Sequence, residues 1–216
     1  SISAAFSTSS QVDGTKSMNS QPEKWLLAKQ LAAALGYIVL QQDDRLQCTY
    51  ITDMDIPPFR KKGSSAKQQF LHTLMQFPEP SMQSSFAEKA SKHLIKGQTV
   101  LIVITDALEP IEKLESFIRR LRNYAGDIRF IQVVEQDIQH PTFIGDMELF
   151  DIETEKAVNV SISSTTLQDY FESKAQHEKQ LDLLCAKYNV AKLQVLVGEG
   201  FQQSFFHRLK KANWIQ

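Results

Sequence analysis

The stretch Thr99-Val-Leu-Ile-Val-Ile-Thr105 decides the fold of this chain, because its apolar residues run without interruption between two threonines. Such a run predicts a central parallel strand that is covered on both faces. Asp106 follows the run directly, and Pro110 predicts the start of a helix that continues to Tyr124. We therefore expect Leu101 and Val103 to be almost fully buried, and we expect the same of Leu31 in the apolar helical pattern that follows Pro22.

Strands and helices alternate on both sides of this run. Buried or alternating apolar patterns predict further strands at 45–52, 128–134 and 192–197, and an edge strand between Pro58 and Gly63. Helical spacing predicts helices at 22–39, 64–77, 84–95, 165–187 and 201–212. Ser64 is the expected N-cap of the second helix, whose expected inner face comprises Phe70, Leu71, Leu74 and Met75.

This alternation predicts an α/β fold, a Rossmann-like three-layer sandwich with a mostly parallel central sheet and helices on both faces. The segments Met147–Ile152 and Ala157–Ile162 predict an additional β-hairpin near residues 146–162. Gly126 is expected to follow the C-terminus of the helix that starts at Pro110. Residues 1–20 predict a short strand followed by a polar loop. We expect residues 1–216 to form a single domain.

Composition excludes several classes of protein. The chain has 216 residues, of which 42% are hydrophobic and 23% charged, and its net charge of −1 predicts no nucleic-acid partner. No stretch reaches the roughly 18 to 20 apolar residues of a membrane span, so we expect no membrane contact from this domain. Because the chain opens at Ser1 without a Met, we expect it to be cut from a longer protein, whose missing part could hold membrane segments.

The two cysteines, Cys48 and Cys185, lie in apolar surroundings in the sequence. We expect both to be reduced and unpaired, which fits a reducing compartment.

Catalytic motifs are missing from the sequence. It holds no glycine-rich phosphate loop, no Walker sequence, no nucleophile elbow and no Cys/His spacing typical of zinc. The sequence therefore predicts that the protein is not an enzyme. A less favoured alternative is a Mg²⁺-dependent hydrolase, for which Asp53 and Asp55 are the nearest candidate bases.

Oxygen ligands at strand ends are the remaining candidate chemistry. Ligands of open α/β sheets bind at the carboxyl ends of the strands, where Asp106 is expected. Mg²⁺ takes an octahedral shell of oxygens. The residues of the right types, with Ser85 as an alternative to Ser84, are Asp13, Thr15, Ser17, Ser84 and Asp106. The competing interpretation is that Asp106 caps the following turn and that Val12-Asp-Gly-Thr-Lys-Ser-Met18 is an ordinary polar loop.

Several segments resemble a known family over nearly the whole chain after Pro22. They are EKWLLAKQLAAALGYIVLQQDDRL (23–46), LIVITD (101–106), GDMELFDIETEKAVNVSI (145–162), LQDYFESKAQHEKQLDLLCAKYNV (167–190) and FFHRLKKANW (205–214). Together they resemble the domain-of-unknown-function family 58, whose members are von Willebrand factor A-like domains of bacteria. The resemblance implies a central, mostly parallel sheet and a metal-ion-dependent adhesion site. That site uses an Asp-x-Ser-x-Ser motif, a Thr from a second loop and an Asp at a strand end.

Asp106 matches the last position of this site, and Ser84 falls where the family has a Thr. The first motif has two registers. In one, Asp13-Gly-Thr-Lys-Ser17 matches it with Thr15 in place of a Ser; in the other, Ser1–Phe6 occupies the motif, which is then degenerate, and residues 7–21 form an inserted loop.

The expected function is protein–protein interaction, either through a Mg²⁺-dependent adhesion site or as a metal-free scaffold whose site has decayed. The resemblance implies a MoxR-type AAA+ ATPase as the partner. It also implies a cytoplasmic location, with a tether to the inner membrane through a missing segment.

Overall fold

A six-stranded sheet forms the centre of the computed structural model, which describes residues 2–6, 20–78, 84–135, 145–151, 156–162 and 164–215. The strands lie in the order β3 (Phe59–Lys62), β2 (Arg45–Tyr50), β1 (Ile2–Phe6), β4 (Gln98–Thr105), β5 (Ala125–Val134) and β8 (Ala191–Leu196). All neighbours are parallel except β3, which pairs antiparallel with β2. The predicted mostly parallel sheet and its edge strand before Gly63 are confirmed.

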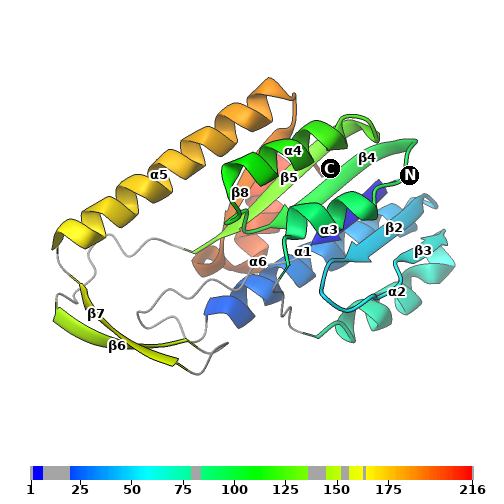
Figure 1. The fold of residues 1–216 in the computed structure, drawn as a ribbon. Helices are drawn as coiled ribbons and strands as arrows, with labels where there is room; N and C mark the ends of the chain where they lie inside the picture. Colours follow the sequence, from blue (N-terminus) through cyan, green and yellow to red (C-terminus); the bar gives the residue numbers. More distant parts are fainter. Residues whose placement is uncertain are drawn as a thin grey trace.

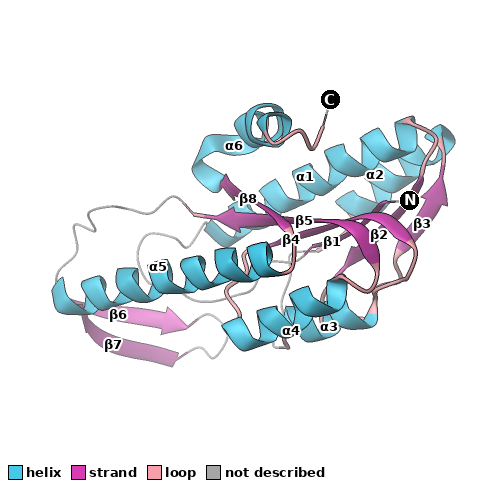
Figure 2. Ribbon diagram, turned by 90° about the horizontal axis from the view of Figure 1, so that it is seen from above, coloured by secondary structure: helices cyan, strands magenta, loops and turns pink. Residues whose placement is uncertain are grey.

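Helices cover both faces of the sheet, as Figures 1 and 2 show. One face carries α1 (Ser20–Gln41), α2 (Lys67–Met75) and the C-terminal elements α6 (Gly200–Gln202) and η3 (Gln203–Leu209). The other carries α3 (Phe86–Lys92), α4 (Ile111–Leu121) and α5 (Ser164–Lys187). The short turns η1 (Ser64–Ala66) and η2 (Val197–Glu199) join elements. The molecule is therefore an α/β sandwich.

Two hydrophobic cores lie on the two faces of the sheet. The core under α1 includes Leu31, and the core under α4 includes Leu101 and Val103. These three side chains are at most 2% exposed, so the predicted burial is confirmed. Because successive residues of a strand point to opposite faces, β4 contributes to both cores, which accounts for its apolar run from Leu101 to Ile104.

A separate two-stranded antiparallel sheet confirms the predicted hairpin. It pairs β6 (Gly145–Asp151) with β7 (Lys156–Ile162). No helix among the described residues combines the length and the apolar character that crossing a bilayer requires. That residues 1–216 form one domain stays a prediction.

Three local predictions are wrong, each for a physical reason. Ser64 lies inside η1 instead of capping a helix, because its N–H donates to Asp43 Oδ1 at 3.0 Å. Met75 is 76% exposed because α2 ends there. Gly126 lies within β5, since the chain enters the strand only four residues after α4 ends at Leu121.

Lys29 of α1 holds the C-terminus of α2. Its Nζ donates to the carbonyl oxygens of Met75 and Phe77, both at 3.0 Å. A cation at this end of a helix satisfies carbonyls that lack intrahelical partners. Desolvation by burial lowers the pKa of the Lys29 amine. The contact fixes the point from which the chain continues toward α3.

Both cysteines should resist alkylation in the native protein. Cys48 and Cys185 are buried and free, which confirms the prediction that they are unpaired. Burial raises the thiol pKa to about 12 for Cys48 and to about 11 for Cys185, so the reactive thiolate is scarce at neutral pH. Iodoacetamide followed by mass spectrometry should label neither cysteine in native protein at pH 8 and both in urea. Rapid native labelling of Cys48 would contradict its place in β2.

Candidate functional site

The candidate site lies where the strand order of the sheet reverses. From β1, the chain proceeds to β2 and β3 on one side and then crosses to β4, β5 and β8 on the other. Ligands of open α/β sheets bind beyond the carboxyl ends of the strands at such a point. Asp106 follows β4 directly and is only 2% exposed. A carboxylate is therefore held at the switch point, as the sequence predicts.

The turn after Asp106 is strained. Ala107 has a φ of +56°, in the left-handed region that costs an L-residue other than Gly, Asn or Asp about 1–2 kcal/mol. Three contacts hold it: the Ala107 N–H donates to Thr105 Oγ1 at 3.2 Å, His177 Nε2 donates to the Ala107 carbonyl at 2.9 Å, and Gln132 Nε2 donates to the Asp106 carbonyl at 3.4 Å. Strain that is held in place by so many contacts is typical of functional positions.

Ser84 is engaged with a different carboxylate. Its Oγ donates to Asp53 Oδ1, which also forms an ion pair with Lys89 Nζ at 2.6 Å. Lys89 Nζ donates in addition to the Thr52 carbonyl at 2.9 Å. These contacts join the loop after β2 to α3. The contacts of Ser84 therefore do not extend to Asp106.

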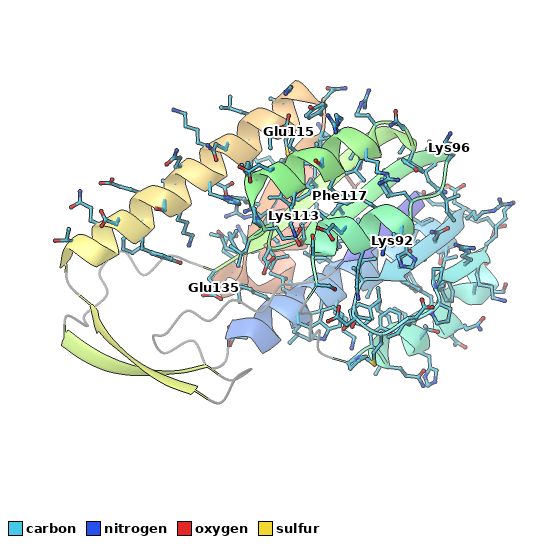
Figure 3. The ribbon with its side chains drawn as sticks, viewed as in Figure 1. Lys92, Lys96, Lys113, Glu115, Phe117 and Glu135 are labelled. Carbon is cyan, nitrogen blue, oxygen red and sulfur yellow. The ribbon has the colours of Figure 1, made fainter. Side chains whose placement is uncertain are left out.

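The loop after β4 is tied to α3 as well. Glu109 Oε2 accepts the N–H of Ala87 at 3.0 Å, and Ser85 caps α3 by accepting the N–H of Glu88 at 3.3 Å. Lys113 of α4 pairs with Glu88 at 2.9 Å. Figure 3 shows Lys113 and Phe117 on α4, where Phe117 meets Phe86 edge to face with the ring centroids 5.8 Å apart. The loops that hold Asp106 and Ser84 are thus both tied to α3, although the two residues have different partners.

The remaining predicted ligands, Asp13, Thr15 and Ser17, lie outside the described residues. The register that places the first motif at Ser1–Phe6 is wrong, because Ile2–Phe6 is the strand between β2 and β4. In the other register, six residues (7–12) separate the end of β1 from Asp13. Within the described part of the chain, no three His, Cys, Asp or Glu side chains gather as a metal site.

Exposed apolar side chains flank the same edge. Met54, in the loop after β2, is 57% exposed, and Leu108, two residues after Asp106, is 36% exposed. Lys24 of α1 pairs with Glu135 at the end of β5 at 2.7 Å (Figure 3 labels Glu135). The edge thus combines a buried carboxylate, exposed apolar side chains and paired charges.

A partly buried polar network under α5 escaped sequence analysis. Glu178 of α5 accepts from Gln132 Nε2 at 2.9 Å, from Gln194 Nε2 at 2.5 Å and from Lys192 Nζ. Gln194 Nε2 also donates to Gln132 Oε1 at 3.1 Å. The signal in the sequence is the single glutamine within each of two apolar strands, Gln132 and Gln194. A polar residue in a buried strand requires a partner.

Replacing Glu178 with Ala should destabilise the fold by about 1–3 kcal/mol, because the buried Gln132 amide then loses its closest acceptor and Lys192 loses one of its two carboxylate partners. Urea denaturation followed by circular dichroism measures this free energy of unfolding. The matched control is Glu172→Ala on the same helix, where Glu172 is exposed and accepts from Gln168 alone among the described contacts. Equal stabilities of the two variants would contradict the structural role of the network.

The fold and its edge define an α/β domain with a candidate site at the carboxyl ends of its strands. Residues 4–181 match the family described as "Protein of unknown function DUF58", and the chain belongs to this family. No curated protein matches the chain.

Two solved structures align with nearly all of the chain. One is an aerotolerance-related membrane protein from Bacteroides fragilis NCTC 9343 with multiple mutations to serines, which is 8% identical with a TM-score of 0.49; the alignment covers 97% of this chain and 98% of that one. The other is the conserved hypothetical protein BatB from Bacteroides thetaiotaomicron, which is 10% identical with a TM-score of 0.43 over 99% and 98% of the two chains.

Proposed function

We propose that this chain is a protein-interaction domain with a von Willebrand A-like, Rossmann-like fold. We propose further that its partner docks where the parallel strands end, on the surface formed by their carboxyl ends and the following loops, which we call the carboxyl edge of the sheet. The observation that carries the proposal is the buried Asp106 and the strained Ala107 at the switch point. The exposed apolar side chains of Met54 and Leu108 supply contact area beside them.

The residues around this edge favour docking without a metal. A Mg²⁺ site of the adhesion type needs several hydroxyl and carboxylate oxygens around one point. The hydroxyl of Ser84 is bonded to Asp53. The residues that follow β1 directly, Ser7-Thr-Ser-Ser-Gln11, contain no carboxylate. The described ligand set is therefore incomplete, and the partner would be held by shape and by hydrogen bonds.

A Mg²⁺-dependent adhesion site is the second candidate, because Asp106 lies at the carboxyl end of β4, where the family resemblance implies a ligand. Asp13, Thr15 and Ser17 would then complete the ligand set. A bound cation would offer an open position to a carboxylate of the partner. Calorimetry with Mg²⁺ separates the candidates: the metal-free form gives no heat above dilution at millimolar metal, whereas the adhesion site gives heat that Asp106→Asn removes.

The partner we propose is a MoxR-type AAA+ ATPase, on the strength of the family resemblance, and the location we propose is the cytoplasmic side of the inner membrane. That the chain is not an enzyme stays a prediction. A hydrolase would need a general base beside Asp106, and Asp53 instead accepts from Ser84 and Lys89.

Leu108→Glu should weaken binding of the MoxR-type ATPase from the same genome at least about tenfold, or about 1.4 kcal/mol. It places a charge inside the proposed interface. The control is Leu183→Glu on α5, where the leucine is 62% exposed and the change should have little effect. Binding is measured by biolayer interferometry in Mg²⁺ and in EDTA. Nucleotide is left out, so that EDTA removes no Mg²⁺–nucleotide complex from the ATPase and acts on this chain alone. Equal weakening by both variants, or loss of wild-type binding in EDTA, would overturn the metal-free proposal.

A further inference from the structure

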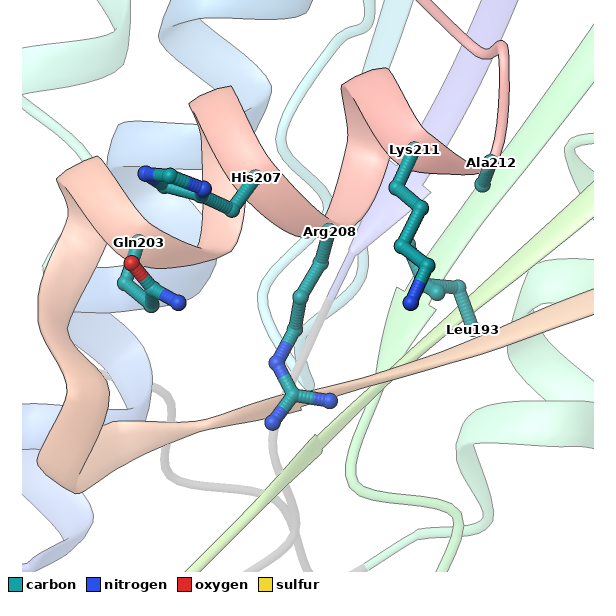
Figure 4. A pocket seen from close by; sticks show the side chains of 6 residues that line it. All are labelled: Leu193, Gln203, His207, Arg208, Lys211 and Ala212. Carbon is teal, nitrogen blue, oxygen red and sulfur yellow. The ribbon is translucent and has the colours of Figure 1, made fainter.

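A basic groove lies between β8 and the C-terminal helical segment. The groove has a volume of about 540 Å³ and is lined by Leu193, Gln203, His207, Arg208, Lys211 and Ala212. Figure 4 shows Arg208 and Lys211 extending from the helical segment toward β8, with Gln203 and His207 side by side further along it. The groove therefore runs beside a strand and is lined with nitrogen donors.

The lining residues form a row. Gln203, His207 and Lys211 are four residues apart, a spacing that keeps them on one flank of a helix. The segment contains the π-helical element η3, a form that occurs frequently at functional sites. The row thus presents its donors along the length of the groove instead of around the helix.

The charge of the groove is only partly neutralised. Arg208 is bonded to Glu199, with Nε donating to Oε2 at 2.6 Å, and this contact raises the pKa of the guanidinium. Across the described residues, no carboxylate lies within ion-pair distance of Lys211 or His207. Lys211 therefore brings a positive charge to the groove that no described carboxylate balances, and His207 adds a hydrogen-bond donor, so the complementary ligand is acidic.

Strand β8 is the last strand in the order of the six-stranded sheet, and is therefore an edge strand. The opposite edge, β3, carries the exposed basic residues Arg60, Lys61 and Lys62, which discourage pairing with another strand. On β8, by contrast, Lys192 forms ion pairs with Glu178 and Asp182. Arg208 Nη1 donates to the Gln194 carbonyl at 3.3 Å, so a side chain already bonds to the backbone of β8. An extended peptide could replace this contact with ladder hydrogen bonds.

We propose that this groove binds an extended acidic segment of a partner protein. The segment lies along β8, forms backbone hydrogen bonds with the strand, and places carboxylates against Lys211 and His207. This second docking surface shares no residue with the edge at Asp106, so either proposal can fail without the other.

The test uses the whole chain and three fluorescein-labelled peptides of about eight residues, the length of a typical strand. The first alternates Thr with Glu, the second alternates Thr with Lys, and the third is the acidic peptide with N-methylated alternate amides. Fluorescence anisotropy measures binding to the wild type, to Lys211→Glu and to the matched control Lys210→Glu, whose lysine is exposed and lies outside the groove lining.

We expect saturable binding of the acidic peptide alone, weakened about fivefold by Lys211→Glu and changed less than about twofold by Lys210→Glu. N-methylation of the acidic peptide should weaken its binding at least as much as Lys211→Glu does, because the methyl groups remove the ladder hydrogen bonds with β8. No binding of the acidic peptide at about 1 mM would overturn the proposal. Equal binding of the acidic and basic peptides, equal effects of the two lysine variants, or full binding of the methylated peptide would overturn it as well.

Discussion

Val103→Asp is expected to abolish the native fold. Val103 is 0% exposed and lies in β4 between β1 and β5, opposite Phe130. Its side chain belongs to the core under α4, with Leu114 and Phe117. Burying an unpaired carboxylate there costs at least several kcal/mol, which is comparable with the total stability of about 5–15 kcal/mol of a typical protein.

Circular dichroism and thermal melting of purified protein measure this effect. The control is Asn123→Asp, which introduces the same carboxylate at an exposed turn after α4 and should leave the melting temperature almost unchanged. A soluble Val103→Asp protein that melts like the wild type would contradict the position of β4 at the centre of the sheet.

Gly36→Val should destabilise the protein by about 3 kcal/mol through overpacking. A Cβ at Gly36 of α1 would lie 2.5 Å from Phe70 Cζ and 3.0 Å from Leu46 Cδ2. Phe70 is 1% exposed and packs against Phe59 with ring centroids 5.1 Å apart, so its ring has no room to move. The close approach of α1 and α2 therefore depends on the absence of a side chain at Gly36.

Urea denaturation measures the loss, and Gly126→Val is the matched control. A Cβ at Gly126 has only the Thr99 carbonyl nearby, at 3.8 Å, and a β-branched residue suits a strand. Phe70→Leu should recover part of the stability lost by Gly36→Val, because it shortens the side chain that clashes. A Gly36→Val protein as stable as the Gly126→Val control would show that α1 and α2 pack differently.

Apolar patterning predicts the elements that form the core. The runs at 99–105 and 128–134 become β4 and β5, and the helix beginning near Pro22 becomes α1, because burial on both sides leaves little choice of residue type. Element ends are harder to predict. Ser64 is a residue type that often caps helices, but its own N–H donates a hydrogen bond to Asp43, which lies far away in the sequence. The π-helical form of η3 arises from a shift in hydrogen bonding that leaves no pattern in the residues.

The candidate site was predictable only in part. Asp106 follows an apolar run, so its place at the end of β4 can be predicted from the sequence. The bond between Ser84 and Asp53 cannot, because it joins loops 31 residues apart whose approach depends on the packing of α3. The strain at Ala107 has no sequence signal either, since alanine rarely adopts a positive φ.

The central claim is that a protein partner docks on the carboxyl edge of the sheet without a metal. Hydrogen exchange followed by mass spectrometry tests it most directly, on the chain alone and with the MoxR-type ATPase, in EDTA and without nucleotide. The account predicts that the partner slows exchange in the segments 52–56, 84–88 and 106–110 and leaves the exposed turn at 122–124 unchanged. Binding in EDTA that protects none of these three segments, or protection of them that requires Mg²⁺, would contradict it.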